Sequence, residues 1–226
     1  MRYLIIAAHP DDEVLGCGGT IARLNQEGEE TFVAILGEGM TARYDERQDA
    51  DSRLLEGLRA KSRKVAEFLG VKDLFMHDFP DNRFDTVPLL DIVKAIERVI
   101  DTLKPEVVFT HHGSDLNIDH VITFRATLTA VRPTVGCPVR AVHAYEVASS
   151  SEWAFGSFER AFRPNMFFDI SQTLELKVSA MKLYEGELRK YPHPRSAEAL
   201  EAIARKWGAT VGLGAAEAFE TVRCIY

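Results

Sequence analysis

The chain has 226 residues, of which 46% are hydrophobic and 27% charged, and its net charge at pH 7 is −7. This length and composition predict one globular domain over residues 1–226, and the negative charge argues against nucleic acid or an anionic membrane as the main partner. No apolar run approaches the roughly 20 residues of a membrane-spanning helix, and the first apolar run is too short for a signal peptide.

Strand and helix patterns alternate through the first 130 residues. Short apolar runs predict buried strands at 3–8, 31–36, 74–76 and 107–110. Between them, apolar stripes at helical spacing predict one helix over 54–69, stopped by Gly70, and another over 92–103, closed by Pro105. This alternation predicts a Rossmann-like, three-layer α/β fold around a mostly parallel sheet.

The last third of the chain has a different pattern. Residues 140–148 and 166–170 are expected to form strands, and the apolar stripe over 174–188 predicts a helix, so that these elements complete the same domain. The polar stretch 45–52 is expected to be a mobile surface loop. The three cysteines are scattered and odd in number, which favours free thiols in a reducing cytoplasm.

Two groups of ligand-type residues follow the first and the fourth predicted strand. Ala8-His9-Pro10-Asp11-Asp12-Glu13 comes after the first, and the segment 110–120, which ends in Asp119-His120, comes after the fourth. In a doubly wound sheet these two strands are neighbours, and ligands bind in the crevice at their carboxyl ends. We therefore expect both groups to meet at one site.

The first group has the chemistry of a metal site that activates water. Imidazole and carboxylate are the ligands that a divalent metal takes for this purpose, and a further carboxylate beside the metal can accept the proton of the water. His9 and Asp12 are spaced to point at one ion, whereas Asp11 between them faces elsewhere. The alternative is structural, because Asp is also a favoured helix N-cap.

At these residues the chain resembles the LmbE/PIG-L family of zinc-dependent N-acetyl-sugar deacetylases. The resemblance implies zinc on His9, Asp12 and His120, with Asp11 as general base. The ligand set itself also allows Fe²⁺ or another divalent metal. The resemblance also implies a small N-acetylated sugar as substrate and a homo-oligomer, a trimer or a hexamer. The matching segments are Ala8–Glu13 with Gly16-Cys17-Gly18-Gly19-Thr20, Gly37-Glu38-Gly39, Phe79-Pro80-Asp81, Asp119-His120, and Phe168-Asp169-Ile170-Ser171 before a helix that contains Lys177.

The chain departs from the family near the last metal ligand. Many members carry a histidine where this chain has Asn117, and certain members a tyrosine where it has Asp115. Asn117 can donate a hydrogen bond to an oxyanion but cannot transfer a proton. The proton donor is therefore open between protonated Asp11 and a nearby imidazole, that of His111, His112 or His193.

Further residues are candidates for binding the substrate, each with a structural alternative. Arg59 and Asp81 match family positions, but one would otherwise be a surface arginine and the other part of a turn after Pro80. One of the adjacent pair His111 and His112 is expected to point away from the site. The full set of expected substrate-binding residues is Arg59, Asp81, His111, His112, Asp115 and His193. His77 and His143 are expected to be ordinary strand or loop residues, and the glycines at 16–19 to allow close packing rather than to hold a phosphate.

Together these features predict a metal-dependent N-deacetylase that releases acetate from an N-acetylglucosamine-type glycoside, glycoconjugate or nucleotide sugar. One alternative is a metal-dependent amidase that acts on another N-acyl group or a thiol conjugate. The other is a sugar-binding module that has lost its proton donor.

Overall fold

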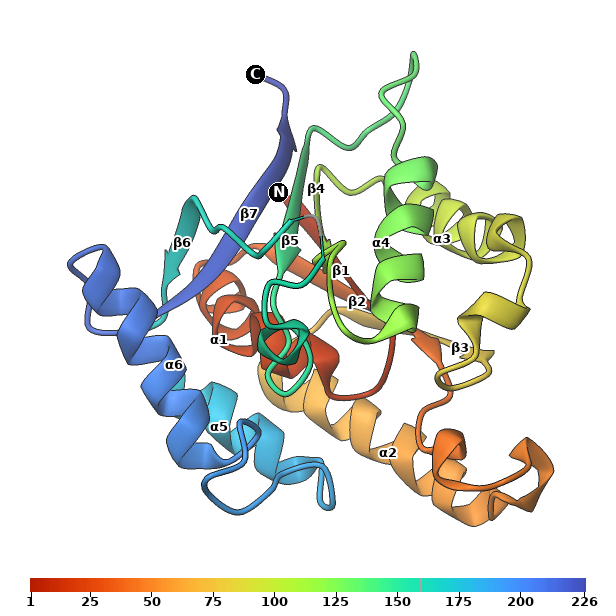
Figure 1. The fold of residues 1–226 in the computed structure, drawn as a ribbon. Coiled ribbons are helices and arrows are strands. Elements are labelled where there is room, and N and C mark those ends of the chain that lie inside the picture. Colours follow the sequence, from red (N-terminus) through yellow and green to blue (C-terminus); the bar gives the residue numbers. More distant parts are fainter. Residues whose placement is uncertain (159) are drawn as a thin grey trace.

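The computed structural model describes residues 1–158 and 160–226. Seven strands form one sheet in the order β3-β2-β1-β4-β5-β7-β6 (Figure 1). The strands are β1 (Arg2–Ala7), β2 (Glu30–Gly37), β3 (Asp73–Phe79), β4 (Val107–His111), β5 (Ala141–Tyr145), β6 (Met166–Asp169) and β7 (Ala216–Cys224). The helices are α1 (Asp12–Gln26), α2 (Ser52–Leu69), α3 (Leu89–Leu103), α4 (Ile118–Ala130), α5 (Leu174–Leu183) and α6 (Ala197–Thr210), with short 3-10 turns η1 (Thr41–Arg43), η2 (Arg47–Asp49), η3 (Phe84–Thr86) and η4 (Glu152–Ala154).

The sheet is parallel from β3 to β5 and becomes antiparallel at β7, which pairs with β5 on one side and β6 on the other. The four strands expected in the first 130 residues are all present, and β1 lies between β2 and β4. The predicted α/β class and mostly parallel sheet are confirmed. The carboxyl ends of β1 and β4 therefore lie side by side.

Helices cover both faces of the sheet, as the alternation of β1 side chains requires. Tyr3, Ile5 and Ala7 pack into a core shared with α1, α2, α5 and α6. Leu4 and Ile6 point the other way, into a second core closed by α3 and α4. Figure 1 shows α3 and α4 on one side of the sheet and the other helices opposite them. The three-layer arrangement is thus the predicted one.

The C-terminal third holds the main differences from the sequence-based expectation. The helix expected over 174–188 ends at Leu183, because Tyr184 leaves the helical conformation and Gly186 follows with φ +95°. Helix α6, capped by the Ser196 hydroxyl, and strand β7 were not predicted. The stretch 45–52 contains η2, and α2 begins at its last residue.

Glycines let α1 pack closely against the elements behind it. A Cβ atom at Gly16 would lie 2.7 Å from Cγ of Tyr145, and one at Gly19 would lie 2.9 Å from Ile170. Cys17 is fully buried in the same core. These contacts support the packing interpretation of the glycine run, and they fix the first turn of α1 beside β5.

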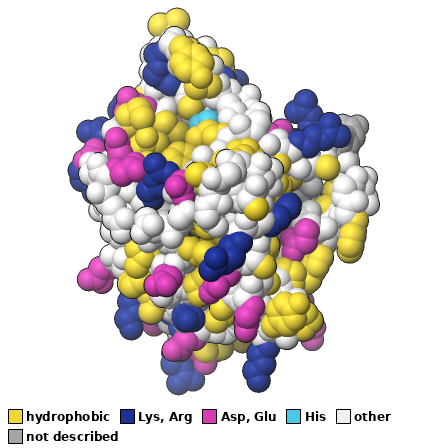
Figure 2. All heavy atoms as spheres, turned by 90° about the vertical axis from the view of Figure 1, so that its left-hand side faces the viewer, with side chains coloured by type: hydrophobic (Ala, Val, Ile, Leu, Met, Phe, Trp, Pro, Cys, Tyr) yellow, Lys and Arg dark blue, Asp and Glu magenta, His cyan; other side chains and the backbone are white. Residues whose placement is uncertain are grey.

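The lengths of the helices and the charges on the surface can be compared with what a membrane or a nucleic acid would require. Among the described residues, every helix is too short or too polar to cross a lipid bilayer. Figure 2 shows the face that carries α6, where basic and acidic side chains are interspersed among apolar ones. The described side chains on that face do not gather into a basic patch of the kind that nucleic acids bind.

Candidate active site

The predicted metal ligands meet where β1 and β4 end. Asp12 Oδ2 lies 3.4 Å from His9 Nδ1 and 3.3 Å from His120 Nε2. One ligand atom from each of these three residues lies within 4.8 Å of the others, and all three side chains are buried. His9 follows β1, Asp12 begins α1 and His120 lies in the first turn of α4. The parallel pairing of β1 with β4 is what brings them together.

The donor set fits a divalent metal. Asp12 Oδ1 is buried without a hydrogen-bond partner, although Oδ2 accepts a hydrogen bond from the His9 backbone N–H. Burial alone would lower the pKa of His120, but Asp12 and Asp115 raise it to about 9. The cluster thus stabilises positive charge, as a cation site must. Two imidazoles and one carboxylate are a ligand set for zinc or Fe²⁺, and three protein ligands leave a position for water.

A second layer of carboxylates orients both histidines. His9 Nε2 lies 2.9 Å from Asp119 Oδ2, while Asp119 Oδ1 accepts a hydrogen bond from the Phe84 N–H. His120 Nδ1 lies 3.1 Å from Asp115 Oδ1. Each imidazole therefore keeps its other nitrogen for the side of Asp12, as carboxylate–histidine pairs do in metal sites.

Asp115 was expected to bind the substrate, but the structure places its carboxylate against His120 and away from the cavity. It is 2% exposed, and the hydroxyls of Ser150 and Ser151 donate to its two oxygens. Burial alone would raise the pKa of Asp115, but the hydrogen bonds and the charge of His120 hold it at about 2. Asp119 was not singled out for this orienting role, although its position next to His120 in a helical first turn was an available signal.

Asp11 is turned away from the other two acidic residues by its backbone. It precedes α1 with φ +103°, the left-handed region that side chains rarely adopt, and its N–H donates to Glu13 Oε2. Tyr184 donates to the other Glu13 oxygen at 2.6 Å, so Glu13 is a buried support for this turn. Burial raises the pKa of Asp11 well above 3.8, and the Arg195 guanidinium, 2.6 Å from Oδ2, opposes that shift.

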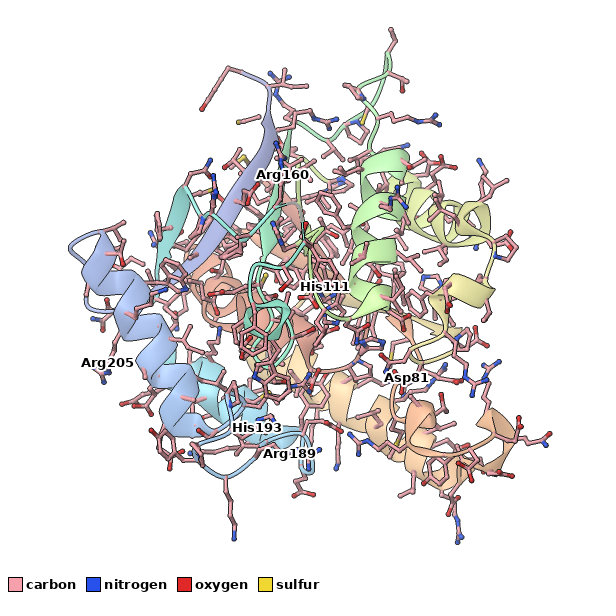
Figure 3. The ribbon with its side chains drawn as sticks, viewed as in Figure 1. Asp81, His111, Arg160, Arg189, His193 and Arg205 are labelled. Carbon is pink, nitrogen blue, oxygen red and sulfur yellow. The ribbon has the colours of Figure 1, made fainter. Side chains whose placement is uncertain are left out.

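A cavity of about 310 Å³ opens beside Asp11 and His9. Its lining includes Asp81 and Asn117, together with Arg189, His193 and Arg195 from the α5–α6 connection. Figure 3 shows Asp81 apart from His193 and Arg189, which lie close to each other. The volume and polar lining are those of a site for a small polar ligand.

Asp81 and Asn117 reach the cavity as expected. Asp81 accepts the Ala42 N–H and lies 3.3 Å from His9 Nε2. Asn117 caps α4 by accepting the Asp119 N–H, and its Nδ2 donates to Asn82 Oδ1 at 2.9 Å. One Nδ2 hydrogen of Asn117 therefore remains for a ligand.

Besides Asp115, three further predicted substrate residues do not line the cavity. His111 is fully buried against His120, with ring centroids 4.0 Å apart, and its Nε2 accepts the Ala8 N–H. His112 points to another surface, where Nε2 lies 3.4 Å from Glu220. Arg59 lies on α2 and donates to the carbonyl of His77 in the neighbouring strand β3. The direction of each side chain from its own element excludes it from the cavity.

The remaining histidines are placed as follows. His193 lines the cavity, and its Nδ1 accepts the Arg195 N–H at 3.1 Å, so only Nε2 is left for a ligand. His143 lies on β5 away from the cavity, 3.2 Å from the Thr221 hydroxyl. His77 lies on β3 and is also outside the cavity. Besides the role of Asp119, the sequence did not predict Arg195, whose only signal was its position after Pro192-His193-Pro194.

Known proteins resemble the chain in sequence and in fold. The sequence model of the PIG-L family, described as GlcNAc-PI de-N-acetylase, matches residues 4–131. A Bacillus cereus protein named probable N-acetyl-alpha-D-glucosaminyl L-malate deacetylase 2 is 28% identical over 193 residues, which cover 82% of this chain and 83% of the relative.

Two solved structures show how widely the fold is used. N,N'-diacetylchitobiose deacetylase from Pyrococcus horikoshii superposes with a TM-score of 0.78 at 21% identity, covering 98% of this chain and 84% of the other. The 4-carboxy-2-hydroxymuconate hydratase from Pseudomonas putida KT2440 has the same TM-score and identity, with 98% and 95% covered. The shared fold alone therefore does not fix the reaction.

Proposed function

The chain belongs to the PIG-L family, and we propose that it is a zinc-dependent hydrolase that removes the N-acetyl group of an amino sugar and releases acetate. The observation that carries this proposal is the His9–Asp12–His120 cluster with a separate carboxylate, that of Asp11, beside a cavity that His9 and Asp11 both line. The deacetylases among its relatives support an N-acetylglucosamine-type glycoside, glycoconjugate or nucleotide sugar as the substrate class.

Each site residue has a role in this reaction. His9 Nδ1, Asp12 and His120 Nε2 would hold the metal, which when bound supplies a water of lowered pKa and polarises the amide carbonyl. Asp11 accepts the proton of the attacking water and returns it to the leaving amine. Of the imidazoles considered as proton donor, His111 and His112 do not reach the cavity, and His193 is the remaining alternative. The free Nδ2 hydrogen of Asn117 donates to the developing oxyanion.

The walls of the cavity bind the sugar in this proposal. Asp81 accepts hydrogen bonds from sugar hydroxyls, and Nε2 of His193 also contacts the substrate. Residues 1–226 act as one domain, which the single seven-stranded sheet supports. The enzyme is cytoplasmic in this proposal, in line with the free thiols of Cys17, Cys137 and Cys224. It also assembles as a homo-oligomer, which light scattering can test.

The test compares variants in acetate release and in zinc content. Asp11→Asn is expected to bind one zinc per chain and to lose most turnover, whereas His120→Ala is expected to lose both. His77→Ala is the matched control, because His77 lies outside the cavity. Equal loss of zinc in both site variants would make Asp11 a ligand and overturn its assignment as base.

Substrates and metals are varied in the same assay. The panel contains N-acetylglucosamine, its glycosides, nucleotide sugars and N-acyl compounds without a sugar. Turnover of only the last group would favour the amidase alternative, and binding without turnover would favour the sugar-binding module. Full activity after chelation would refute the metal mechanism, and metal analysis of anaerobically purified protein separates zinc from Fe²⁺.

A further inference from the structure

The carboxylate of Asp11 is held by one guanidinium from the far end of the sequence. Arg195 Nη1 lies 2.6 Å from Asp11 Oδ2, although 184 residues separate the two. Asp11 is almost completely buried, with 3% of its side chain exposed, and the Asp12 carboxylate is its sequence neighbour. A charged, short hydrogen bond of this kind fixes direction as well as charge. One oxygen of Asp11 is thereby committed to Arg195, and the other is left for the reaction.

Contacts other than the one with Asp11 also hold Arg195 in place. Its Nε donates to Ser149 Oγ at 2.8 Å and lies 3.3 Å from the Ala148 carbonyl, and its backbone N–H donates to His193 Nδ1. Ser149 has φ +68°, so the loop after β5 adopts an unusual backbone conformation where it receives the guanidinium. The next residue, Ser196, caps α6. The guanidinium thus bridges two loops and the turn before α1.

The other arginines of the cavity have different surroundings. Arg43 donates to both oxygens of Glu187, and the exposed Arg189 makes no ion pair within 4.0 Å among the described residues. Glu187 lies 3.8 Å from Arg195, so its main ion pair is with Arg43. Of the arginines that line the cavity, Arg195 is the one whose guanidinium reaches the Asp11 carboxylate within hydrogen-bond distance.

We propose that Arg195 is the positioning residue of the general base: its contact with Asp11 Oδ2 aims Oδ1 at the water to be deprotonated. This inference rests on the proposed function. A misplacement of the base by about 1 Å costs roughly 100-fold in rate, so loss of the contact lowers kcat and leaves substrate binding nearly unchanged. A direct substrate contact by Arg195 would instead raise KM.

The experiment is a double-variant cycle with Arg195→Ala and Asp11→Asn on the zinc-loaded protein. Arg195→Ala is expected to keep its zinc and lower kcat about 100-fold, with KM within about twofold of the parent. Because Arg195 acts through Asp11, the double variant is expected to be as slow as Asp11→Asn alone, within about twofold. Arg205→Ala is the matched control, since Arg205 is exposed on α6, away from the cavity (Figure 3).

Two results would overturn the inference: an additional 100-fold loss in the double variant, or a rise in KM with unchanged kcat in Arg195→Ala. If Arg195→Ala does not fold, the same cycle is run with Arg195→Lys, which keeps the charge but not the two-sided fork to Ser149 and Asp11. A loss of about tenfold that vanishes in the Asp11→Asn background is then expected. Absence of turnover by the parent protein on every substrate would refute the proposed function itself, which is a distinct outcome.

Discussion

The packing of α1 against Tyr145 makes a sharp prediction for Gly16→Ala. The added methyl group would lie 2.7 Å from Cγ of the Tyr145 ring, where contacts of 3.4–4 Å are ordinary. The ring has no room to yield, because it is fully buried and its hydroxyl donates to the Ile6 carbonyl at 2.8 Å. The helix must therefore shift, by roughly 1 Å, to relieve the overlap.

The magnitude follows from two opposing effects. Overpacking a tight core costs about 1–3 kcal/mol, and the rigid ring places this site near the upper end. Alanine in place of glycine inside a helix returns up to about 1 kcal/mol. The expected net loss is about 2 kcal/mol in the free energy of unfolding, or roughly 4–8 °C in Tm for a chain of this size.

Gly57→Ala is the matched control for Gly16→Ala. Gly57 lies within α2, and a Cβ atom there would meet no other atom within 4 Å. This variant is expected to gain about 0.5–1 kcal/mol, because only the helix propensity changes. Urea unfolding at fixed zinc concentration measures both variants. Equal stabilisation in the two helices would refute the close-packing argument.

Two further predictions concern single polar residues. Asp115→Asn is expected to weaken zinc binding by about 10–100-fold in a chelator competition, because His120 loses its orienting carboxylate; unchanged affinity would remove Asp115 from that role. Burial lowers the pKa of His143 to about 4 in the folded protein, below the 6.5 of the unfolded chain. The contribution of neutral His143 to the free energy of unfolding is therefore fully present above pH 6.5, and it falls by roughly 2–3 kcal/mol as the pH drops toward 4. His143→Gln is expected to reduce that loss in acid unfolding curves, and an unchanged pH dependence would contradict it.

The sequence predicted best where the signal was local and repeated. Buried parallel strands are near-continuous apolar runs, and helix ends carry stop residues such as Gly70, which has φ +78°. The order of the first four strands then follows from right-handed crossovers, which is why the candidate metal ligands could be paired across β1 and β4. Strand β7 was not predicted because its sequence mixes apolar and polar residues, and it joins the sheet antiparallel to β5, which lies far before it in the chain.

At the candidate site, the directions of individual side chains could not be predicted from the sequence. Asp115 and His111 lie next to the ligands in sequence, but the turn after β4 points one at His120 and buries the other beneath it. Arg195 lies on a loop whose course depends on α6, an element without a strong sequence signal. The contact between Arg195 and Asp11 joins residues 184 positions apart, so it depends on the tertiary fold and no local sequence pattern predicts it.

The left-handed backbone of Asp11 ties the chemistry of this enzyme to its marginal stability. A non-glycine residue at φ +103° costs of order 1–3 kcal/mol, which the supports from Glu13, Tyr184 and Arg195 must offset. A glycine there would relax the turn and at the same time remove the proposed base. Selection for robustness and selection for turnover therefore oppose each other at this position, and a search for thermostable variants of the chain would be drawn toward inactive ones.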